Sequence, residues 1–197
     1  MKAMILDSGA LINLSMNGLL YIFEELKRIS EVRFIITKDV KYETVDRPIG
    51  IPRFELGALN IRLLIDSKIV ELSDDFQIPQ NKLNALTNKY MSLANRSVSS
   101  NNRYIKIVSN AEMSCLALST LLTENKVENM IAIDERTTRI ICEKPENMEK
   151  SMSERLHQTI VVDKQKLKEF SQFRFIRSSE LVYVAYKKGI LKIKNPK

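Results

Sequence analysis

The sequence contains few of the residues that break regular secondary structure or cross-link a chain. Its 197 residues include five glycines, five prolines, two cysteines, one histidine and no tryptophan. With so few breakers, we expect helices and strands joined by short connections. Cys115 and Cys142 lie in apolar contexts without the C-x-x-C spacing of a redox pair, which indicates buried free thiols rather than a disulfide framework.

The single histidine, His157, argues against several kinds of active site. A zinc cluster requires several His or Cys ligands at short spacing, and the sequence contains none in that pattern. No serine or cysteine motif accompanies His157, so a Ser-His-Asp or Cys-His hydrolase is not expected. The aromatic residues lie mainly in apolar runs and leave no evident platform for stacking bases.

Long hydrophobic runs are also missing. The longest ones, such as residues 19–23, are far too short to span a bilayer. The N-terminus carries one lysine and then enters a predicted strand, so we expect no signal peptide. These features predict a cytoplasmic protein without a membrane partner.

Charge is the feature that is present in excess. The net charge is +7, and charged residues make up 28% of the chain against 44% hydrophobic residues. This balance favours an anionic partner, most commonly nucleic acid, although a solvated basic surface would give the same count. The basic residues include a mid-chain group and a lysine-rich tail that is commonly just a solvated chain end: Arg96, Arg103, Lys106, Lys187, Lys188, Lys192, Lys194 and Lys197.

Strand-like and helix-like segments alternate along the chain. Apolar runs predict strands at 3–7, 32–36, 69–72, 130–134, 159–162 and 173–176, with helical spacing between them. This alternation predicts a single α/β domain over residues 1–197, with a mainly parallel sheet between two helical layers. We expect an inserted helical and loop region at about 48–106, including a mobile polar loop at 95–103, and an extended C-terminal part at about 145–197.

Four acidic residues stand at the ends of these predicted elements. Asp7 and Asp134 follow apolar strands, and Glu43 and Glu112 lie near helix N-termini. Such positions share one edge of a doubly wound sheet, so the four carboxylates are predicted to meet there. Their mutual repulsion calls for a cation, and oxygen ligands favour Mg²⁺ or Mn²⁺. Taken singly, each acid could instead be a helix cap or a helix-dipole partner.

Four segments resemble the ordered motifs of PIN-domain nucleases. They are D-S-G-A-L-I at 7–12, I-T-K-D-V-K-Y-E at 36–43, N-A-E-M-S-C-L-A-L at 110–118 and D-E-R-T-T-R at 134–139. The sequence departs from the family pattern at Ile133, where Thr or Ser is frequent, at Glu135, where a second Asp is usual, and at Asn110, near a frequent Gly. The longer insertion and tail suggest a larger stand-alone member.

The resemblance implies a three-layer α/β/α nuclease that hydrolyses RNA with Mg²⁺ or Mn²⁺, either in RNA processing or decay or as the toxin of a toxin–antitoxin pair. Asp7, Glu112 and Asp134 would bind the metal, and Glu43 would be the fourth catalytic acid. Ser8 and Glu135 would orient the ligands. Arg139 would form a structural ion pair, with a phosphate contact as the alternative. Candidate substrate contacts are Arg136, Arg96, Arg103 and Arg177. The family also implies RNA as a partner, an antitoxin-type protein partner and a homodimer.

Two other interpretations remain open at this point. One is a catalytically weak PIN-fold protein that binds RNA or acts as a scaffold; the four intact acids argue against it. The other is a non-catalytic α/β protein whose acids only cap helices. Thr37 is expected to cap a helix at 38–45, and Ser109 is expected to cap the helix that follows it. Ser8 and Ser178 are also expected as helix N-caps, which gives Ser178 a structural role beside the substrate role of its neighbour Arg177.

Overall fold

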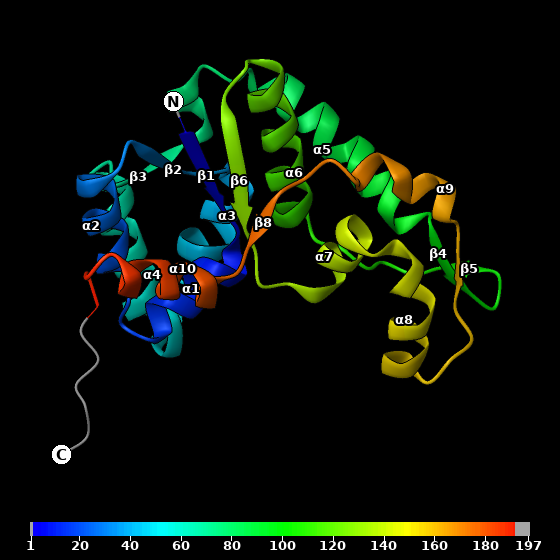
Figure 1. The fold of residues 1–197 in the computed structure, drawn as a ribbon. Helices are drawn as coiled ribbons and strands as arrows, with labels where there is room; N and C mark the ends of the chain where they lie inside the picture. Colours follow the sequence, from blue (N-terminus) through cyan, green and yellow to red (C-terminus); the bar gives the residue numbers. More distant parts are fainter. Residues whose placement is uncertain (1, 192–197) are drawn as a thin grey trace.

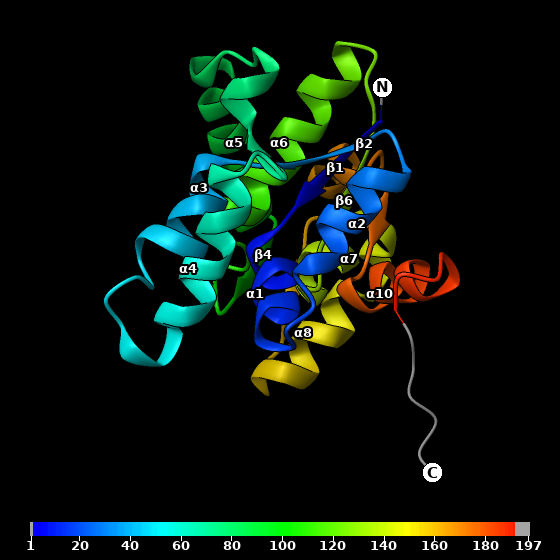
Figure 2. The same ribbon diagram turned by 90° about the vertical axis from the view of Figure 1, so that its left-hand side faces the viewer.

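The computed structural model describes residues 2–191 and confirms the predicted three-layer α/β/α architecture (Figures 1 and 2). The central sheet has five strands in the order β3-β2-β1-β6-β8, and all its pairings are parallel. The strands are β1 (Lys2–Leu6), β2 (Val32–Ile36), β3 (Val70–Leu72), β6 (Glu128–Ala132) and β8 (Phe175–Ile176). The predicted basic residues Lys192, Lys194 and Lys197 lie outside the described residues.

Strand β1 is the centre of the sheet. Ile5 pairs with Ile35 of β2 and with Ile131 of β6, and all three side chains are fully buried. A strand that is apolar on both faces is typical of a parallel sheet covered by helices on both sides. This arrangement fixes the carboxyl end of β1, where Asp7 follows, in the middle of the sheet edge.

Helices cover the two faces of the sheet (Figure 2). Helix α2 (Tyr21–Ile29) packs on β2 on one face, with α10 (Ser178–Lys187) beside it. On the other face α6 (Asn110–Glu124) packs on β1 and β6, and α5 (Gln80–Asn95) lies outside α6. Because α6 is enclosed between the sheet and α5, most of its side chains are buried.

The remaining helices connect and extend this core. Helix α3 (Lys38–Lys41) runs directly into a π-helical turn (Tyr42–Asp46), so the predicted helix at 38–45 is regular only in its first turn. The others are α1 (Ser8–Met16), α4 (Pro52–Asp66), α7 (Arg136–Glu143), α8 (Met148–Leu156) and α9 (Lys164–Leu167). None of the helices within residues 2–191 combines the length and apolarity needed to cross a bilayer.

The prediction of a mobile loop at 95–103 is wrong, because the structure forms a hairpin there. Strand β4 (Val98–Ser100) pairs with β5 (Arg103–Tyr104) through a turn in which Asn101 and Asn102 have φ values of 49° and 59°. Two left-handed residues are what a tight hairpin turn requires, and Asn adopts them readily. Strand β7 (Val161–Val162) pairs with β4, so the segment predicted as a strand at 159–162 joins this small sheet rather than the central one.

Local capping explains where several helices begin. Thr37 and Ser109 are N-caps, as predicted, since each hydroxyl accepts a backbone N–H bond at the start of its helix. The N-cap predictions for Ser8 and Ser178 are wrong, because both are the first residues of their helices and Asp7 and Arg177 precede them as caps. The Ser178 hydroxyl is therefore available for a different contact.

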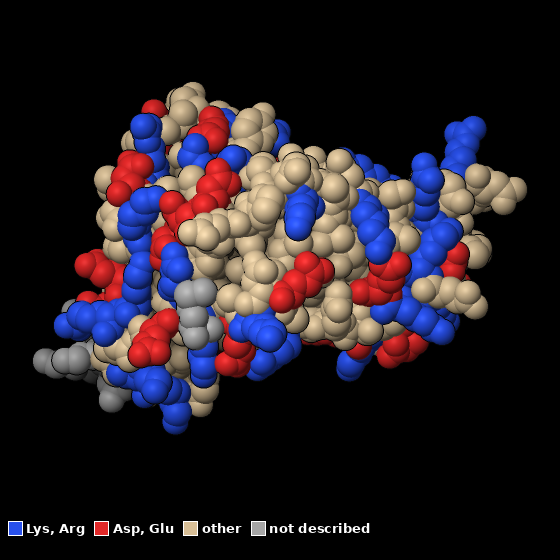
Figure 3. All heavy atoms as spheres, turned by 90° about the horizontal axis from the view of Figure 1, so that it is seen from above, with Lys and Arg blue, Asp and Glu red and all other residues tan. Residues whose placement is uncertain are grey.

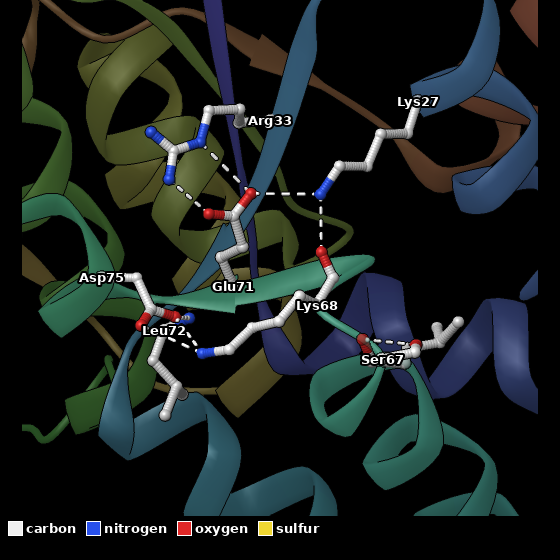
Figure 4. A network of polar contacts seen from close by, with 8 residues as sticks. Lys27, Arg33, Ser67, Lys68, Glu71, Leu72 and Asp75 are labelled. Atoms are coloured by element: carbon white, nitrogen blue, oxygen red, sulfur yellow. Dashed lines mark hydrogen bonds and ion pairs between the residues drawn. The ribbon is translucent and has the colours of Figure 1, made fainter.

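A polar network lies at the β3 edge of the sheet (Figure 4). Glu71 of β3 accepts hydrogen bonds from Arg33 of β2 and, at 3.2 Å, from Lys27 of α2. Arg33 also stacks over Phe76, 3.7 Å from the ring centroid. The network ties strand β3 to β2 and α2 through a nearly buried carboxylate.

Candidate active site

Asp7 occupies the carboxyl end of β1 and caps α1. Its Oδ2 accepts the Gly9 backbone N–H at 3.1 Å, whereas Oδ1 is buried and has no hydrogen-bond partner among the described residues. The residue is only 3% exposed. Burial raises the pKa of Asp7 to about 7, with a further contribution from the Glu112 charge and a smaller one from Glu43. The site therefore contains a buried carboxylate for which residues 2–191 supply no compensating cation.

Gly9 allows Asp7 and Asp134 to approach the same point on α1. A Cβ added at Gly9 would lie 3.3 Å from Asp7 Oδ2 and 4.0 Å from Asp134 Cβ. The first distance is tighter than ordinary van der Waals contact, so a side chain here would push against the carboxylate. The glycine in the D-S-G-A-L-I motif is thus explained by close packing, since its φ is not in the left-handed region.

Glu112 lies in the first turn of α6 and is held by three donors. Its Oε1 accepts the Ser109 hydroxyl at 3.0 Å, and its Oε2 accepts the Thr138 hydroxyl at 2.7 Å and the Ser109 backbone N–H at 3.3 Å. Burial raises the pKa of Glu112 despite these bonds, and the nearby Glu135 charge adds to the shift. Ser109 and Thr138 thereby fix the orientation of the carboxylate that acts on Asp7.

Glu43 reaches the same region from the π-helical turn after β2. It is half-buried, and its charge contributes to the raised pKa values of Asp7 and Cys115. π-Helical turns are rare and frequently occur at functional sites, because they redirect a side chain that a regular helix would point elsewhere. Asp7, Glu43 and Glu112 are therefore close enough to interact electrostatically.

Asp134 is positioned by the C-terminal part of the chain. Its Oδ1 accepts the Ser178 backbone N–H at 2.8 Å, and its Oδ2 accepts the Ser178 hydroxyl at 2.6 Å and Asn13 Nδ2 at 3.0 Å. Burial alone would raise the pKa of Asp134, but these hydrogen bonds lower it below its ordinary value, with help from the Arg177 charge. Asp134 is thus satisfied by the protein, in contrast to Asp7.

The orienting residues differ from those predicted. The Ser8 hydroxyl is buried without a partner in the described chain, and Glu135 caps α7 by accepting the Thr138 N–H at 2.5 Å. Neither side chain hydrogen-bonds to one of the four acids within residues 2–191. The acids are instead oriented by residues that sequence reasoning missed in this role: Asn13, Ser109, Thr138 and Ser178. Thr138 lies in the D-E-R-T-T-R motif, and this position was the one sequence feature that could have pointed to its role in orienting an acid.

The predicted arginines separate into two groups. Arg136 and Arg177 line a cavity of about 830 Å³ that also reaches Asp134. Arg96 follows α5 and Arg103 lies in the small antiparallel sheet, and neither lines that cavity. Arg139 forms the predicted ion pair, with Nη2 at 2.9 Å from a Glu143 oxygen.

A second cavity, of about 490 Å³, lies between α1 and α4. Glu43 lines it together with apolar side chains, of which Met16, Ile51 and Phe54 are exposed. Exposed apolar residues gathered at a cavity are typical of protein-binding surfaces. The expected protein partner and the expected homodimer both stay predictions.

The acidic side chains of the site fit a divalent cation in part. Carboxylate oxygens are the ligands that Mg²⁺ and Mn²⁺ prefer, and the buried, unpartnered Oδ1 of Asp7 is an available acceptor. Within residues 2–191, however, no three His, Cys, Asp or Glu side chains are already arranged to hold a metal ion. The fit therefore rests on Asp7, with Glu112 and Glu43 close enough to raise its pKa.

Comparisons with protein-family models, curated proteins and solved structures found no match.

Proposed function

We propose that the protein is a divalent-metal-dependent endoribonuclease, similar to PIN-domain nucleases, that hydrolyses phosphodiester bonds in RNA. One observation carries the proposal. Asp7 Oδ1 is buried at the carboxyl edge of a parallel sheet, lacks a hydrogen-bond partner in the described chain, and lies in the electric fields of Glu112 and Glu43. A buried charge in such surroundings is costly unless a cation is added.

The residues have distinct roles in this proposal. Asp7 and Glu112 would hold Mg²⁺ or Mn²⁺, and Glu43 would add negative charge to the same region. When bound, the ion supplies positive charge at the phosphorus centre and lowers the pKa of the attacking water. Ser109 and Thr138 keep Glu112 pointed at this region, and Ser178 and Asn13 hold Asp134 beside it.

The first test is cleavage of single-stranded RNA in the presence of Mn²⁺. Asp7→Asn and Glu112→Gln each remove one charge with little change of shape, and we expect each to lower the cleavage rate by at least about 100-fold, a loss of about 2.7 kcal/mol in transition-state stabilisation. Both variants should still bind RNA. Glu128→Gln, an exposed acid at the amino end of β6, is the matched control and should cleave at the wild-type rate.

Metal binding can be measured without any substrate. A cation that binds only the native state at 100 times its dissociation constant adds about 2.7 kcal/mol to the free energy of unfolding. We expect Mn²⁺ to stabilise the wild type but not Asp7→Asn. Because Asp7 must lose its proton and its pKa is raised to about 7, Mn²⁺ affinity should be lower at pH 6 than at pH 8. Unchanged cleavage and unchanged stabilisation in Asp7→Asn would reject the proposed site.

A catalytically weak RNA-binding protein is the second candidate, and one observation favours it. Both carboxylate oxygens of Asp134 already accept hydrogen bonds from Ser178, and Oδ2 also accepts one from Asn13. Glu112 likewise accepts hydrogen bonds on both oxygens, so among these acids Asp7 is the one with a buried oxygen that has no partner in the described chain. RNA binding without Mn²⁺-dependent cleavage, in wild type and Asp7→Asn alike, would identify this candidate.

A further inference from the structure

The largest cavity described above lies between α7, α8 and the start of α10. Its volume is about 830 Å³, which is within the usual range for pockets that bind small organic groups. It reaches Asp134 and Asn13 at one end, so it adjoins the acidic site. Its far wall is formed by α8, within the extended C-terminal part at 145–197 that sequence analysis set apart from the core.

Cations dominate the wall of this cavity. Arg136, Lys144, Lys150 and Arg177 are all exposed, and none forms an ion pair with a carboxylate of the described chain. Some exposed lysines elsewhere are paired, such as Lys89 with Glu169 at 2.6 Å, whereas others, such as Lys82 and Lys106, form no ion pair within residues 2–191. On the face shown in Figure 3, at the amino ends of the strands, basic and acidic side chains are interspersed. The cavity therefore has positive charge that the protein itself does not compensate.

The acids in the same wall leave this balance positive. Glu143 is engaged by Arg139, and Asp134 is engaged by Ser178 and Asn13. Glu154 is the remaining carboxylate that lines the cavity. The four unpaired cations thus face a single acid that has no ion pair or hydrogen bond within residues 2–191.

Arg139 adds two buried donors to this wall. Its Nη2 is bonded to both Glu143 oxygens at 2.9 and 3.1 Å, but its Nε and Nη1 are buried and have no partner in the described chain. The side chain is only 14% exposed. Buried donors are costly when unsatisfied, and the planar guanidinium matches the oxygens of a phosphate group.

We infer that this cavity binds the phosphate backbone of a single-stranded polynucleotide, at a phosphate other than the one that is cleaved. The inference rests on the proposed function, because it places the strand that reaches the acids along α7 and α8. Arg136, Lys150 and Arg177 supply charge along the strand, and Arg139 adds a guanidinium whose Nε and Nη1 have no partner in the described chain. A polynucleotide carries a negative charge at every phosphate, so one strand can lie against several of these cations at once.

The test measures binding of a fluorescently labelled single-stranded RNA oligonucleotide in EDTA, so that no cleavage occurs. We expect the double variant Arg136→Gln/Lys150→Gln to bind about tenfold more weakly at physiological salt. The slope of log K against log salt should become shallower by about 1.4, because each lost phosphate contact removes about 0.7 for single strands. Lys82→Gln/Lys126→Gln removes the same charge from exposed positions outside the cavity and should leave the slope unchanged.

Arg139→Lys separates the guanidinium contact from charge. The variant keeps its positive charge, so the salt slope should stay at the wild-type value while the affinity falls about fivefold, through loss of the additional donors of the guanidinium. Its thermal unfolding midpoint, compared with wild type, shows that the fold is intact. Wild-type affinity in both cavity variants, or equal losses in the control variant, would overturn the inference.

Competition distinguishes the anion that the cavity takes. Inorganic phosphate or poly-glutamate that displaces the RNA equally well, at equal anion concentration, would show a site for free anions or acidic proteins and would overturn the inference. The cavity inference and the proposed function can fail independently of each other. If the cavity variants lose RNA binding but the wild type shows no Mn²⁺-dependent cleavage, only the nuclease proposal is rejected. If cleavage depends on Asp7 but the cavity variants bind RNA normally, only the inference about the cavity is rejected.

Discussion

Asp7 and Glu71 are both nearly buried acids, but their surroundings shift their pKa values in opposite directions. Burial raises the pKa of Glu71, but hydrogen bonds from Arg33 and Lys27 more than offset this and lower the pKa below its ordinary value (Figure 4). Burial raises the pKa of Asp7 to about 7, because its two backbone contacts offset only part of the shift and no cation within residues 2–191 adds to them. A chain that supplies cations to one buried acid and not to the other leaves the second available for an external partner.

The difference also separates structural from functional charge. Glu71 binds three elements together, because its partners lie on β2 and α2. Asp7 faces Glu112 and Glu43, two further acids from separate elements. Repulsion among these acids costs stability in the absence of a cation, which is common where a site is shaped for binding rather than for folding.

The largest expected effect on stability comes from Asp7→Asn. Asn retains the N-cap contact with Gly9 but cannot ionise. In the wild type the pKa of Asp7 rises from 3.8 unfolded to about 7 folded, so the native state holds the extra proton between these values. Wild-type stability therefore falls as the pH rises through this window, and at pH 8 we expect the variant to be more stable by about 4 kcal/mol, at 1.36 kcal/mol per pKa unit.

Urea unfolding without divalent ions measures this gain at pH 8 and at pH 4, where it should vanish. Asp163→Asn is the matched control, because Asp163 is an N-cap as well but is exposed and faces Lys166. The control should show no gain at pH 8. If Asp7→Asn were less stable than the wild type at pH 8, the native state would already compensate the Asp7 charge. Asp7 and Glu71 would then not differ in this respect.

The sequence predicted the parts of this picture that depend on local pattern. Apolar runs located all five strands of the central sheet, and the carboxyl-edge argument led to Asp7, Glu43 and Glu112. The N-caps Thr37 and Ser109 could also be predicted from the sequence, because a capping side chain contacts a backbone N–H only three residues away.

Contacts between distant segments could not be predicted in this way. Ser178 lies 44 residues beyond Asp134, and nothing in its own segment distinguishes a ligand of that carboxylate from a helix cap. The hairpin at 98–104 was missed because Asn101-Asn102 lacks the glycine that usually marks such a turn. The pairing of β7 with β4 likewise depends on tertiary packing rather than on local sequence.

Glu71→Gln should lower the stability of the protein, whereas Asp7→Asn should raise it. Glu71→Gln keeps the shape of the side chain but removes the charge that faces Arg33 and Lys27. We expect a loss of about 2 kcal/mol in the free energy of unfolding at pH 7, since hydrogen bonds to charged groups are worth more than neutral ones. The loss should shrink as the pH falls through the lowered pKa of Glu71, because the wild-type carboxylate is then protonated.

Urea unfolding again supplies the measurement, and Glu25→Gln supplies the control. Glu25 pairs with Arg28 on the exposed side of α2, and such surface pairs contribute about 0.5 kcal/mol or less. If Glu71→Gln lost no more than Glu25→Gln, the Glu71 network would be a surface feature and not the compensated counterpart of Asp7.

The smallest expected effect concerns Asp134, which is intermediate between the two. Ser178→Ala removes the 2.6 Å hydroxyl bond to Oδ2 but leaves the backbone N–H and Asn13 in place, so we expect a loss of about 1 kcal/mol. The pKa of Asp134 should rise toward its ordinary value, as read from the titration of its carboxyl carbon by NMR. Ser179→Ala, the exposed neighbour, should change neither quantity. If the pKa of Asp134 did not move, the Ser178 hydroxyl would have no part in holding this acid, and Asp134 would belong with Asp7 as a carboxylate that the protein leaves open.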